Sequence, residues 1–281
     1  MKPTFLFIGP DKSGSTWLYE VLRQHAQCFV PPVKDIYFFD RYYERGLDWY
    51  FRFFEAAPPG TLAAGELSHD YLFSSAAAER IAQDLPGVKL ITSLRDPAER
   101  TFSHYLYMIR SGRTRLDFAA ALDRFPELIE NSRYHRHLSE YMRRFERDQI
   151  LVLFFEDLRA SAEDFAQRVF DFLGLPFSEE IDYGQRVLPA SRPRSFALAR
   201  TFKGGAQLAR SLGLARLVGI VKRGPVAGLA YVPYGEDEKP RLDPEMRARL
   251  VETLREDIER LADMLGADLS PWLQAESLSG A

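Results

Sequence analysis

The chain opens, from its fifth residue, with the run Phe5-Leu-Phe-Ile-Gly9-Pro-Asp-Lys12-Ser-Gly14-Ser15-Thr16-Trp17. Its apolar part ends at Gly9, a short loop of small residues follows, and an amphipathic helical pattern begins at Trp17. A strand, a tight turn and a helix in this order direct several backbone N–H groups and a helix N-terminus toward one point. The run therefore predicts a loop that binds phosphate or an anion of similar shape.

This loop differs from the usual phosphate loop in the position of its lysine. The nucleotide-hydrolysing P-loop reads G-x-x-x-x-G-K-[ST]. Here Gly9 and Gly14 keep the spacing and Thr16 follows, but Ser15 stands in the place of the lysine. The lysine is Lys12, inside the loop. The pattern thus keeps the glycine spacing of the loop, but the lysine that binds β- and γ-phosphates stands at another position. This difference argues against a nucleotide kinase or hydrolase.

A second apolar run, starting at Leu90, ends in Arg95-Asp96-Pro97 and leads into a helical pattern that contains Ser103. Proline is well tolerated in a first helical turn. Arg95 would lie at the carboxyl end of its strand, the edge at which open parallel sheets bind ligands. A guanidinium group and a hydroxyl two helical turns later can together hold a second phosphate. An arginine that only pairs with a neighbouring carboxylate is the alternative, and the residues alone leave it open.

Apolar runs alternate with helical patterns along the chain, which indicates βαβ units and a parallel sheet with helices on both faces. We predict an α/β protein with a P-loop-like three-layer fold, in one domain over 1–281. Residues 195–240 are a candidate lid or acceptor-binding insertion. Strands are predicted over 4–9, 61–66, 88–94 and 149–155, and helices over 15–26, 74–84, 97–111, 134–147, 161–173 and 243–265.

The composition, 46% hydrophobic and 27% charged over 281 residues, is that of an ordinary globular protein. A net charge of −3 gives no reason to expect nucleic acid as a partner. Cys28 is the single cysteine, so no intrachain disulfide and no cysteine-cluster metal site can form. No run approaches the ~20 apolar residues of a transmembrane segment. We expect a cytoplasmic protein, and the Ala-, Arg- and Leu-rich usage is typical of a bacterial one.

Several motifs in sequence resemble one family, the sulfotransferases that use 3′-phosphoadenosine 5′-phosphosulfate (PAPS). The loop from Lys12 to Trp17 is similar to their 5′-phosphosulfate loop, and Arg95-Asp-Pro-x-x-Arg100-x-x-Ser103 is similar to their 3′-phosphate motif. Two further runs resemble the carbohydrate, heparan-sulfate-like branch: Lys34-Asp35-Ile-Tyr-Phe38-Phe39-Asp40 and Gly65-Glu66-x-Ser68-x-x-Tyr71-Leu72.

The resemblance implies a metal-free, in-line transfer of a sulfuryl group from PAPS to a hydroxyl of a small-molecule or carbohydrate acceptor. It assigns Asp35 as the general base, where the family usually has glutamate, with His69 and His104 as alternatives. Lys12 is assigned both to catalysis and to the donor. The implied residues for binding PAPS, or its product 3′-phosphoadenosine 5′-phosphate (PAP), are Lys12, Ser13, Gly14, Ser15, Thr16, Trp17, Arg95, Ser103 and Arg194.

Two alternatives to this enzyme remain at this stage. One is a P-loop nucleotide kinase or hydrolase, and the other is a module that binds PAP without catalysis. In the family pattern a lysine follows the glutamate of the second run, whereas here Leu67 follows Glu66. That difference points to another acceptor, or to a different residue that assists the sulfuryl group during its transfer. A homodimer is left open.

Overall fold

The computed structural model describes residues 1–185, 191–193, 195, 200–201, 204–205, 231–234, 238 and 240–274. The chain divides into two compact units. The first comprises Met1–Arg95 and His137–Val187, and the second Asp96–Arg136 and Leu188–Ala281. The predicted single domain stays a prediction, and so does the insertion over 195–240, most of which lies outside the described residues.

The first unit is built on a five-stranded sheet in the order β2-β3-β1-β4-β5. All its neighbouring strands pair in parallel, which confirms the predicted α/β class with a central parallel sheet. β1 lies in the middle, with Phe5 aligned to Gly65 on one side and to Lys89 on the other. The strands are β1 (Phe5–Gly9), β2 (Cys28–Phe29), β3 (Ala63–Leu67), β4 (Lys89–Leu94) and β5 (Ile150–Phe154).

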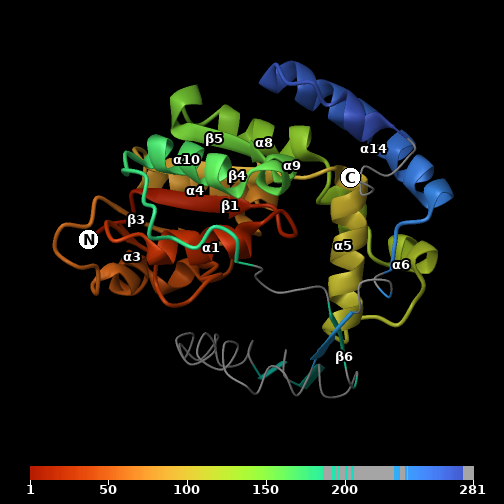
Figure 1. Ribbon diagram of the computed structural model, residues 1–281, viewed down its shortest axis with the longest axis horizontal. Coiled ribbons are helices and arrows are strands. Elements are labelled where there is room, and N and C mark those ends of the chain that lie inside the picture. The colour runs from red at the N-terminus through yellow and green to blue at the C-terminus, as the bar shows by residue number, and fades with distance from the viewer. Residues whose placement is uncertain are drawn as a thin grey trace. The chain divides into compact units, whose positions relative to one another are not determined.

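Helices flank this sheet, as Figure 1 shows. α1 (Ser15–Gln24) and α10 (Ala162–Leu173) pack with alternate strand residues, such as Phe5 and Phe7, in one hydrophobic cluster. Alternation follows from the two-residue period of a strand, which sends neighbouring side chains to opposite faces. The remaining helices of this unit are α2 (Phe38–Arg41), α3 (Leu47–Phe51), α4 (Ser75–Asp84) and α9 (Phe155–Ala160); α8 (Tyr134–Met142) begins just before the unit boundary.

The aromatic segment between β2 and β3 contributes mainly to the core. The side chains of Phe38, Phe39, Tyr50 and Phe54 have no exposed surface. Phe38 and Tyr50 stack with ring centroids 4.6 Å apart, and Phe39 meets Tyr50 edge-on at 5.2 Å. Such contacts add about 0.5–1.5 kcal/mol each to the burial of the rings. This part of the chain is therefore mainly hydrophobic core.

In the second unit, α5 (Pro97–Arg110) is anchored by buried charges. Asp96 caps the helix by accepting from the backbone N–H of Glu99 at 3.0 Å, and Arg247 donates to the same carboxylate at 2.6 Å. Arg100 is also buried, and it donates to the Leu128 carbonyl at 2.7 Å. Further elements in the described part of this unit are α6 (Phe118–Arg124), α7 (Glu127–Glu130), α14 (Pro244–Leu265), the 3₁₀ helix η5 (Ser270–Leu273) and the antiparallel pair β6 (Ser191–Pro193) and β7 (Tyr231–Pro233).

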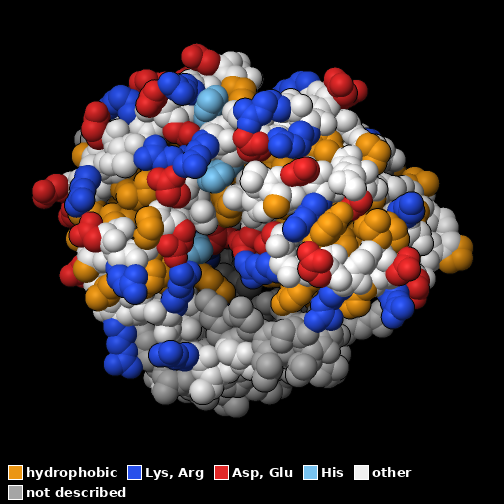
Figure 2. Space-filling model, turned by 180° about the vertical axis from the view of Figure 1, so that it is seen from behind, with side chains coloured by type: hydrophobic (Ala, Val, Ile, Leu, Met, Phe, Trp, Pro, Cys, Tyr) orange, Lys and Arg blue, Asp and Glu red, His pale blue; other side chains and the backbone are white. Residues whose placement is uncertain are grey.

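Charged side chains of both signs are interspersed on the face shown in Figure 2. Cys28 is buried, and burial raises the pKa of its thiol to about 12, which disfavours the reactive thiolate. Among the described residues, no helix is both long and apolar enough to cross a lipid bilayer.

Candidate active site

The loop between β1 and α1 depends on two glycines with left-handed backbone geometry. Gly9 has φ +125°, and a Cβ atom there would collide with the backbone carbonyl of His69. Gly14 has φ +88°, and its Cβ would lie 2.6 Å from the Leu158 side chain. Because any other residue would meet both a steric and a conformational penalty, these positions fix the course of the loop.

Side chains at the end of β4 hold the loop in place. Thr92 donates through Oγ1 to the carbonyl of Gly9 at 2.6 Å, and Ser93 donates through Oγ to the carbonyl of Ser13 at 2.8 Å. The hydroxyl of Ser13 itself turns inward to the carbonyl of Pro10 at 2.7 Å, and its side chain is fully buried. The hydroxyl of Ser13 thus stabilises the loop, whereas Ser15 and Thr16 lie at the start of α1.

The two cations predicted from the sequence, Lys12 and Arg95, meet at the carboxyl ends of β1 and β4. Arg95 donates through Nη1 to the carbonyl of Lys12 at 3.4 Å, and its guanidinium lies 5.0 Å from the centroid of the Phe155 ring. Lys12 is half-buried, with φ +67°, an uncommon conformation for a residue that is not glycine. The sheet edge thus carries two positive charges beside the loop.

A third cation, Lys34, was not among the predicted site residues. Its Nζ donates to Ser15 Oγ at 2.9 Å and to Thr16 Oγ1 at 3.3 Å, and lies 4.0 Å from Asp35 Oδ1. Lys34 therefore links the start of α1 to the predicted base. The sequence feature that could have identified Lys34 as a site residue is its position directly before Asp35.

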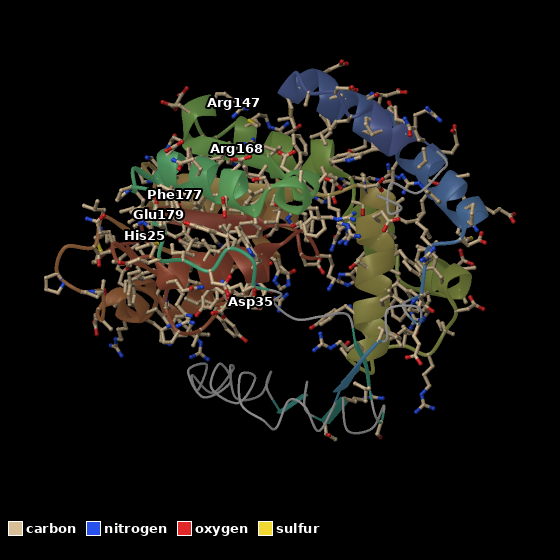
Figure 3. The ribbon with its side chains drawn as sticks, viewed as in Figure 1. His25, Asp35, Arg147, Arg168, Phe177 and Glu179 are labelled. Carbon is tan, nitrogen blue, oxygen red and sulfur yellow. The ribbon has the colours of Figure 1, made fainter. Side chains whose placement is uncertain are left out.

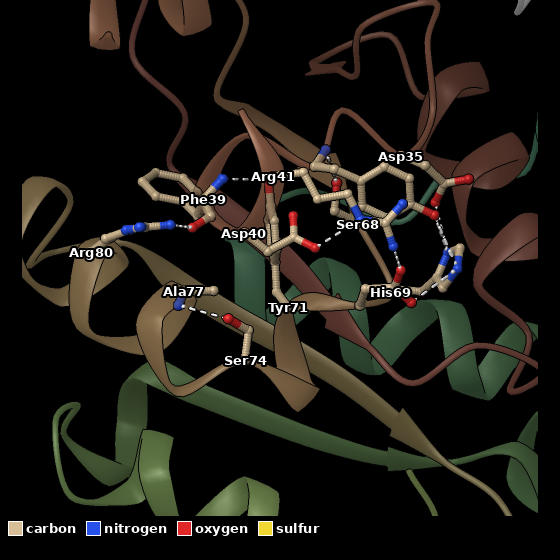
Figure 4. Close-up of polar contacts among 12 residues, drawn as sticks. Asp35, Phe39, Asp40, Arg41, Ser68, His69, Tyr71, Ser74, Ala77 and Arg80 are labelled. Carbon is tan, nitrogen blue, oxygen red and sulfur yellow. Dashed lines mark hydrogen bonds and ion pairs between the residues drawn. The ribbon is translucent and has the colours of Figure 1, made fainter. Parts of the chain in front are cut away.

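Asp35 pairs with His69, as Figure 4 shows. His69 Nδ1 lies 2.8 Å from Asp35 Oδ1, and on the other side of the ring Nε2 lies 3.1 Å from the Tyr37 hydroxyl and 3.4 Å from Asp70 Oδ1. Burial alone would lower the pKa of His69, but the carboxylates of Asp35 and Asp70 outweigh it and raise that pKa above its ordinary value. His69, one of the two alternatives for the general base, thus contacts Asp35, the residue preferred for that role.

The backbone holds Asp35 in an unusual conformation. Asp35 has φ +65° and Tyr37 has φ +57°. The Asp35 N–H donates to the carbonyl of Leu67 at 2.9 Å, and the Tyr37 N–H donates to Ser68 Oγ at 3.0 Å. Left-handed geometry at a residue with a side chain persists only where surrounding contacts fix it, and it is concentrated at functional sites. The end of β3 supplies those contacts here.

Glu66 supports this arrangement from inside the core. Its carboxyl group accepts from Ser68 Oγ at 2.6 Å and from the Tyr71 hydroxyl at 2.6 Å, with the Tyr50 hydroxyl at 3.4 Å. Burial raises the pKa of Glu66 to about 7, against the hydrogen bonds from Ser68 and Tyr71 that favour the ionised form. Through Ser68, this buried carboxyl group fixes the turn that carries Asp35 and Tyr37.

The remaining predicted residues are Trp17, Ser103, His104 and Arg194. Trp17 is buried in the core, where its indole N–H donates to the carbonyl of Tyr183 at 3.1 Å. Ser103 and His104 are half-buried on α5, in the second unit. Arg194 lies outside the described residues. Their predicted roles toward a ligand stay predictions.

A surface pocket elsewhere in the first unit has a different character. It is lined in part by Phe177, Glu179 and Asp182. Figure 3 shows Phe177 and Glu179 away from Asp35. An acidic lining would repel phosphate and sulfate groups. An anionic donor therefore fits the loop and its three cations and not this pocket.

Comparison with known proteins gives a consistent result. The model of the sulfotransferase domain matches residues 2–188. A bifunctional heparan sulfate N-deacetylase/N-sulfotransferase 1 from Xenopus laevis is 27% identical over 98% of this chain, and a membrane-associated sulfotransferase from Dictyostelium discoideum is 36% identical over 38% of it. This chain spans about a third of the Xenopus protein, 31% of its length, and the aligned part covers 23% of the Dictyostelium protein.

The fold also has counterparts among solved structures. A sulfotransferase from Alicyclobacillus acidocaldarius superimposes with a TM-score of 0.73 and 22% sequence identity, covering 98% of this chain and all of that one. A sulfotransferase domain from the curacin biosynthetic pathway gives a TM-score of 0.55 at 16% identity, covering 95% of this chain and 99% of its own.

Proposed function

This chain belongs to the sulfotransferase family, and on that premise we propose that it moves the sulfuryl group of PAPS to a hydroxyl of a small-molecule or carbohydrate acceptor. One observation carries the proposal. Lys34 connects the hydroxyls of Ser15 and Thr16, at the anion-binding loop, with the carboxylate of Asp35. A donor site and a base are thereby adjacent at one edge of the sheet.

The groups around the loop fit an anionic donor. Two ammonium groups, from Lys12 and Lys34, and two hydroxyls, from Ser15 and Thr16, are hydrogen-bond donors suited to phosphate and sulfate oxygens. The start of α1 adds backbone N–H groups and the positive end of the helix dipole. We infer that these residues bind the 5′-phosphosulfate, with Ser13 and Gly14 contributing through the backbone.

The chemistry requires stabilisation of charge and alignment of the reacting atoms. The acceptor oxygen bonds to sulfur while the bond from sulfur to the bridging oxygen breaks, and that bond's electron pair leaves with PAP. Lys12 and Lys34 are proposed to stabilise the negative charge that develops on these oxygens. Phosphoryl transfer places the same demands on its enzymes.

The acceptor proton needs a base, and we assign that role to Asp35. Its carboxylate lies 4.0 Å from Lys34 Nζ, which also contacts the hydroxyls of Ser15 and Thr16 at the loop. Asp35→Asn keeps the size of the side chain and removes its basicity, so turnover should fall ~10²-fold or more while PAP still binds. A fully active Asp35→Asn variant would transfer the role to a histidine.

The 3′-phosphate distinguishes PAPS from ATP, and Arg95 is the residue proposed to bind it. Its position beside Lys12, at the carboxyl end of β4, supports this role. Ser103 and Arg194 are proposed as further ligands because the family resemblance implies them. The guanidinium of Arg95 provides the charge-assisted contact that a phosphate selects.

The names of the relatives suggest a second acceptor class. Several are N-sulfotransferases, which carry sulfate to nitrogen, and one of them aligns over 98% of this chain. An amine acceptor is therefore the second candidate. Leu67 stands where the family pattern has a lysine, and this change supports a mode of acceptor binding that differs from the family pattern.

The decisive experiment compares PAP with ADP in calorimetric titrations of the full chain. PAP should bind at least ~10-fold more tightly, because only PAP offers a 3′-phosphate to Arg95. A sulfate-transfer assay with PAPS and panels of sugar, phenol and amine acceptors follows. Preference for ADP would favour a kinase or hydrolase, and tight PAP binding without any transfer would favour a non-catalytic module.

A further inference from the structure

The imidazole of His69 lies between two carboxylates and a phenol at the candidate site. Nδ1 faces Asp35 at 2.8 Å, while Nε2 faces the Tyr37 hydroxyl at 3.1 Å and Asp70 at 3.4 Å. Arg41 forms an ion pair with Asp70, and its guanidinium lies 4.0 Å from the centroid of the Tyr37 ring. The ring is therefore held on both edges, with Nδ1 directed at the carboxylate assigned as the base.

The orientation of an aspartate carboxylate depends on a fixed hydrogen-bond partner more than that of a stiff side chain does. The terminal torsion of a carboxylate is broad and nearly two-fold, so the group rotates unless a hydrogen bond holds it. The backbone of Asp35 is already fixed by its bond to Leu67 and its left-handed geometry. The contact with His69 restricts the torsions that remain.

We propose that His69 is the positioning residue of this site, which orients the carboxylate of Asp35 for removal of the acceptor proton. The inference rests on the proposed function and goes beyond it by giving His69 a role distinct from that of the base. The proton passes from the acceptor hydroxyl to Asp35, and the oxygen so exposed forms the new bond to sulfur. His69 keeps its Nδ1 proton throughout.

Two substitutions at one position test this role. Asparagine can place an amide N–H where His69 has Nδ1, but it cannot titrate. His69→Ala should lower kcat ~10²-fold with PAP affinity within about twofold, because the cost is misplacement of a reacting group. His69→Asn should recover kcat to within about fivefold of the wild type, and His137→Asn, on α8, is the matched control that should keep wild-type turnover.

A third measurement does not depend on activity. The chain has five histidines, and the His69 imidazole signal can be assigned by its loss in His69→Asn. Asp35→Asn removes a negative charge at 2.8 Å, so the pKa of His69 measured by NMR should fall, while the ring signals of His137 stay unchanged.

The outcomes separate this inference from the proposed function. If His69→Ala turns over like the wild type, or if His69→Asn is as slow as His69→Ala, the positioning role is wrong. An unchanged His69 pKa in Asp35→Asn overturns the pairing itself. A wild-type protein that prefers ADP or makes no sulfated product refutes the function, and the NMR measurement still decides whether the two residues interact.

Discussion

Replacing Glu66 by glutamine should remove a large part of the pH dependence of the stability of the first unit. The carboxyl group is 1% exposed, and burial raises its pKa from 4.5 to about 7. Between these two values the folded protein holds a proton that the unfolded chain releases. The free energy of unfolding therefore falls as the pH rises from about 4.5 to about 7.

The magnitude follows from the two pKa values. At about 1.4 kcal/mol per pH unit, the difference between 4.5 and about 7 corresponds to roughly 3 kcal/mol in total. Between pH 5 and pH 8 the expected loss of unfolding free energy is about 2.5 kcal/mol, because part of the total loss has already occurred below pH 5. Glutamine does not titrate, so Glu66→Gln lacks this loss.

Urea unfolding of wild type and Glu66→Gln at pH 5, 6, 7 and 8 measures the effect, with the exposed Glu44→Gln as the matched control. Asp40, whose pKa burial raises to about 6, is present in all three proteins, so most of its contribution is common to them. The wild type should lose about 2.5 kcal/mol more than Glu66→Gln over this range. Parallel curves for the two proteins would refute the reasoning.

Three further substitutions test the ligand-binding and structural cations. Lys12→Ala should lower kcat by ~10²-fold or more with a milder loss of PAP affinity, and an unchanged kcat at saturating PAPS would exclude it from the chemistry. Arg95→Ala should cost roughly 2 kcal/mol in PAP binding by calorimetry but little for a nucleotide without a 3′-phosphate; equal losses would indicate a structural role. Arg247→Met should cost about 3–5 kcal/mol in denaturant unfolding, because it leaves the Asp96 carboxylate buried without its partner. The exposed Arg260→Met should cost under about 0.5 kcal/mol, and similar costs for both would contradict this account.

The long elements could be predicted from the sequence because their signals are local. The strand predicted over 88–94 is observed at Lys89–Leu94, and the helix predicted over 97–111 at Pro97–Arg110. Apolar runs and a proline at the first helical position suffice for such elements. β2, at two residues, and the short helices between it and β3 are too brief to leave a period, and they were not predicted.

The site was only partly predictable, for a physical reason. Its loop follows from the glycine spacing and the end of β1, and Asp35 from a resemblance. The contacts of Asp35 with His69 and of Lys34 with Ser15 join residues 34 and 19 positions apart, through a turn with left-handed backbone at Asp35. A left-handed backbone can be predicted at a glycine, which adopts it readily, but not from the presence of an aspartate.

The strand order of the first unit has a consequence for how such an enzyme can change its substrate. β1 lies between β3 and β4, so Lys12 and Arg95 follow β1 and β4, whereas Asp35 and His69 follow β2 and β3. Apart from Lys34, which follows β2 and reaches across to Ser15 and Thr16, the half of the sheet edge that would hold an invariant donor is separate from the half that would meet a variable acceptor. Substitutions elsewhere on the β2–β3 half can accumulate, and new acceptors can be tried in succession, while the residues that bind the donor are inherited unchanged.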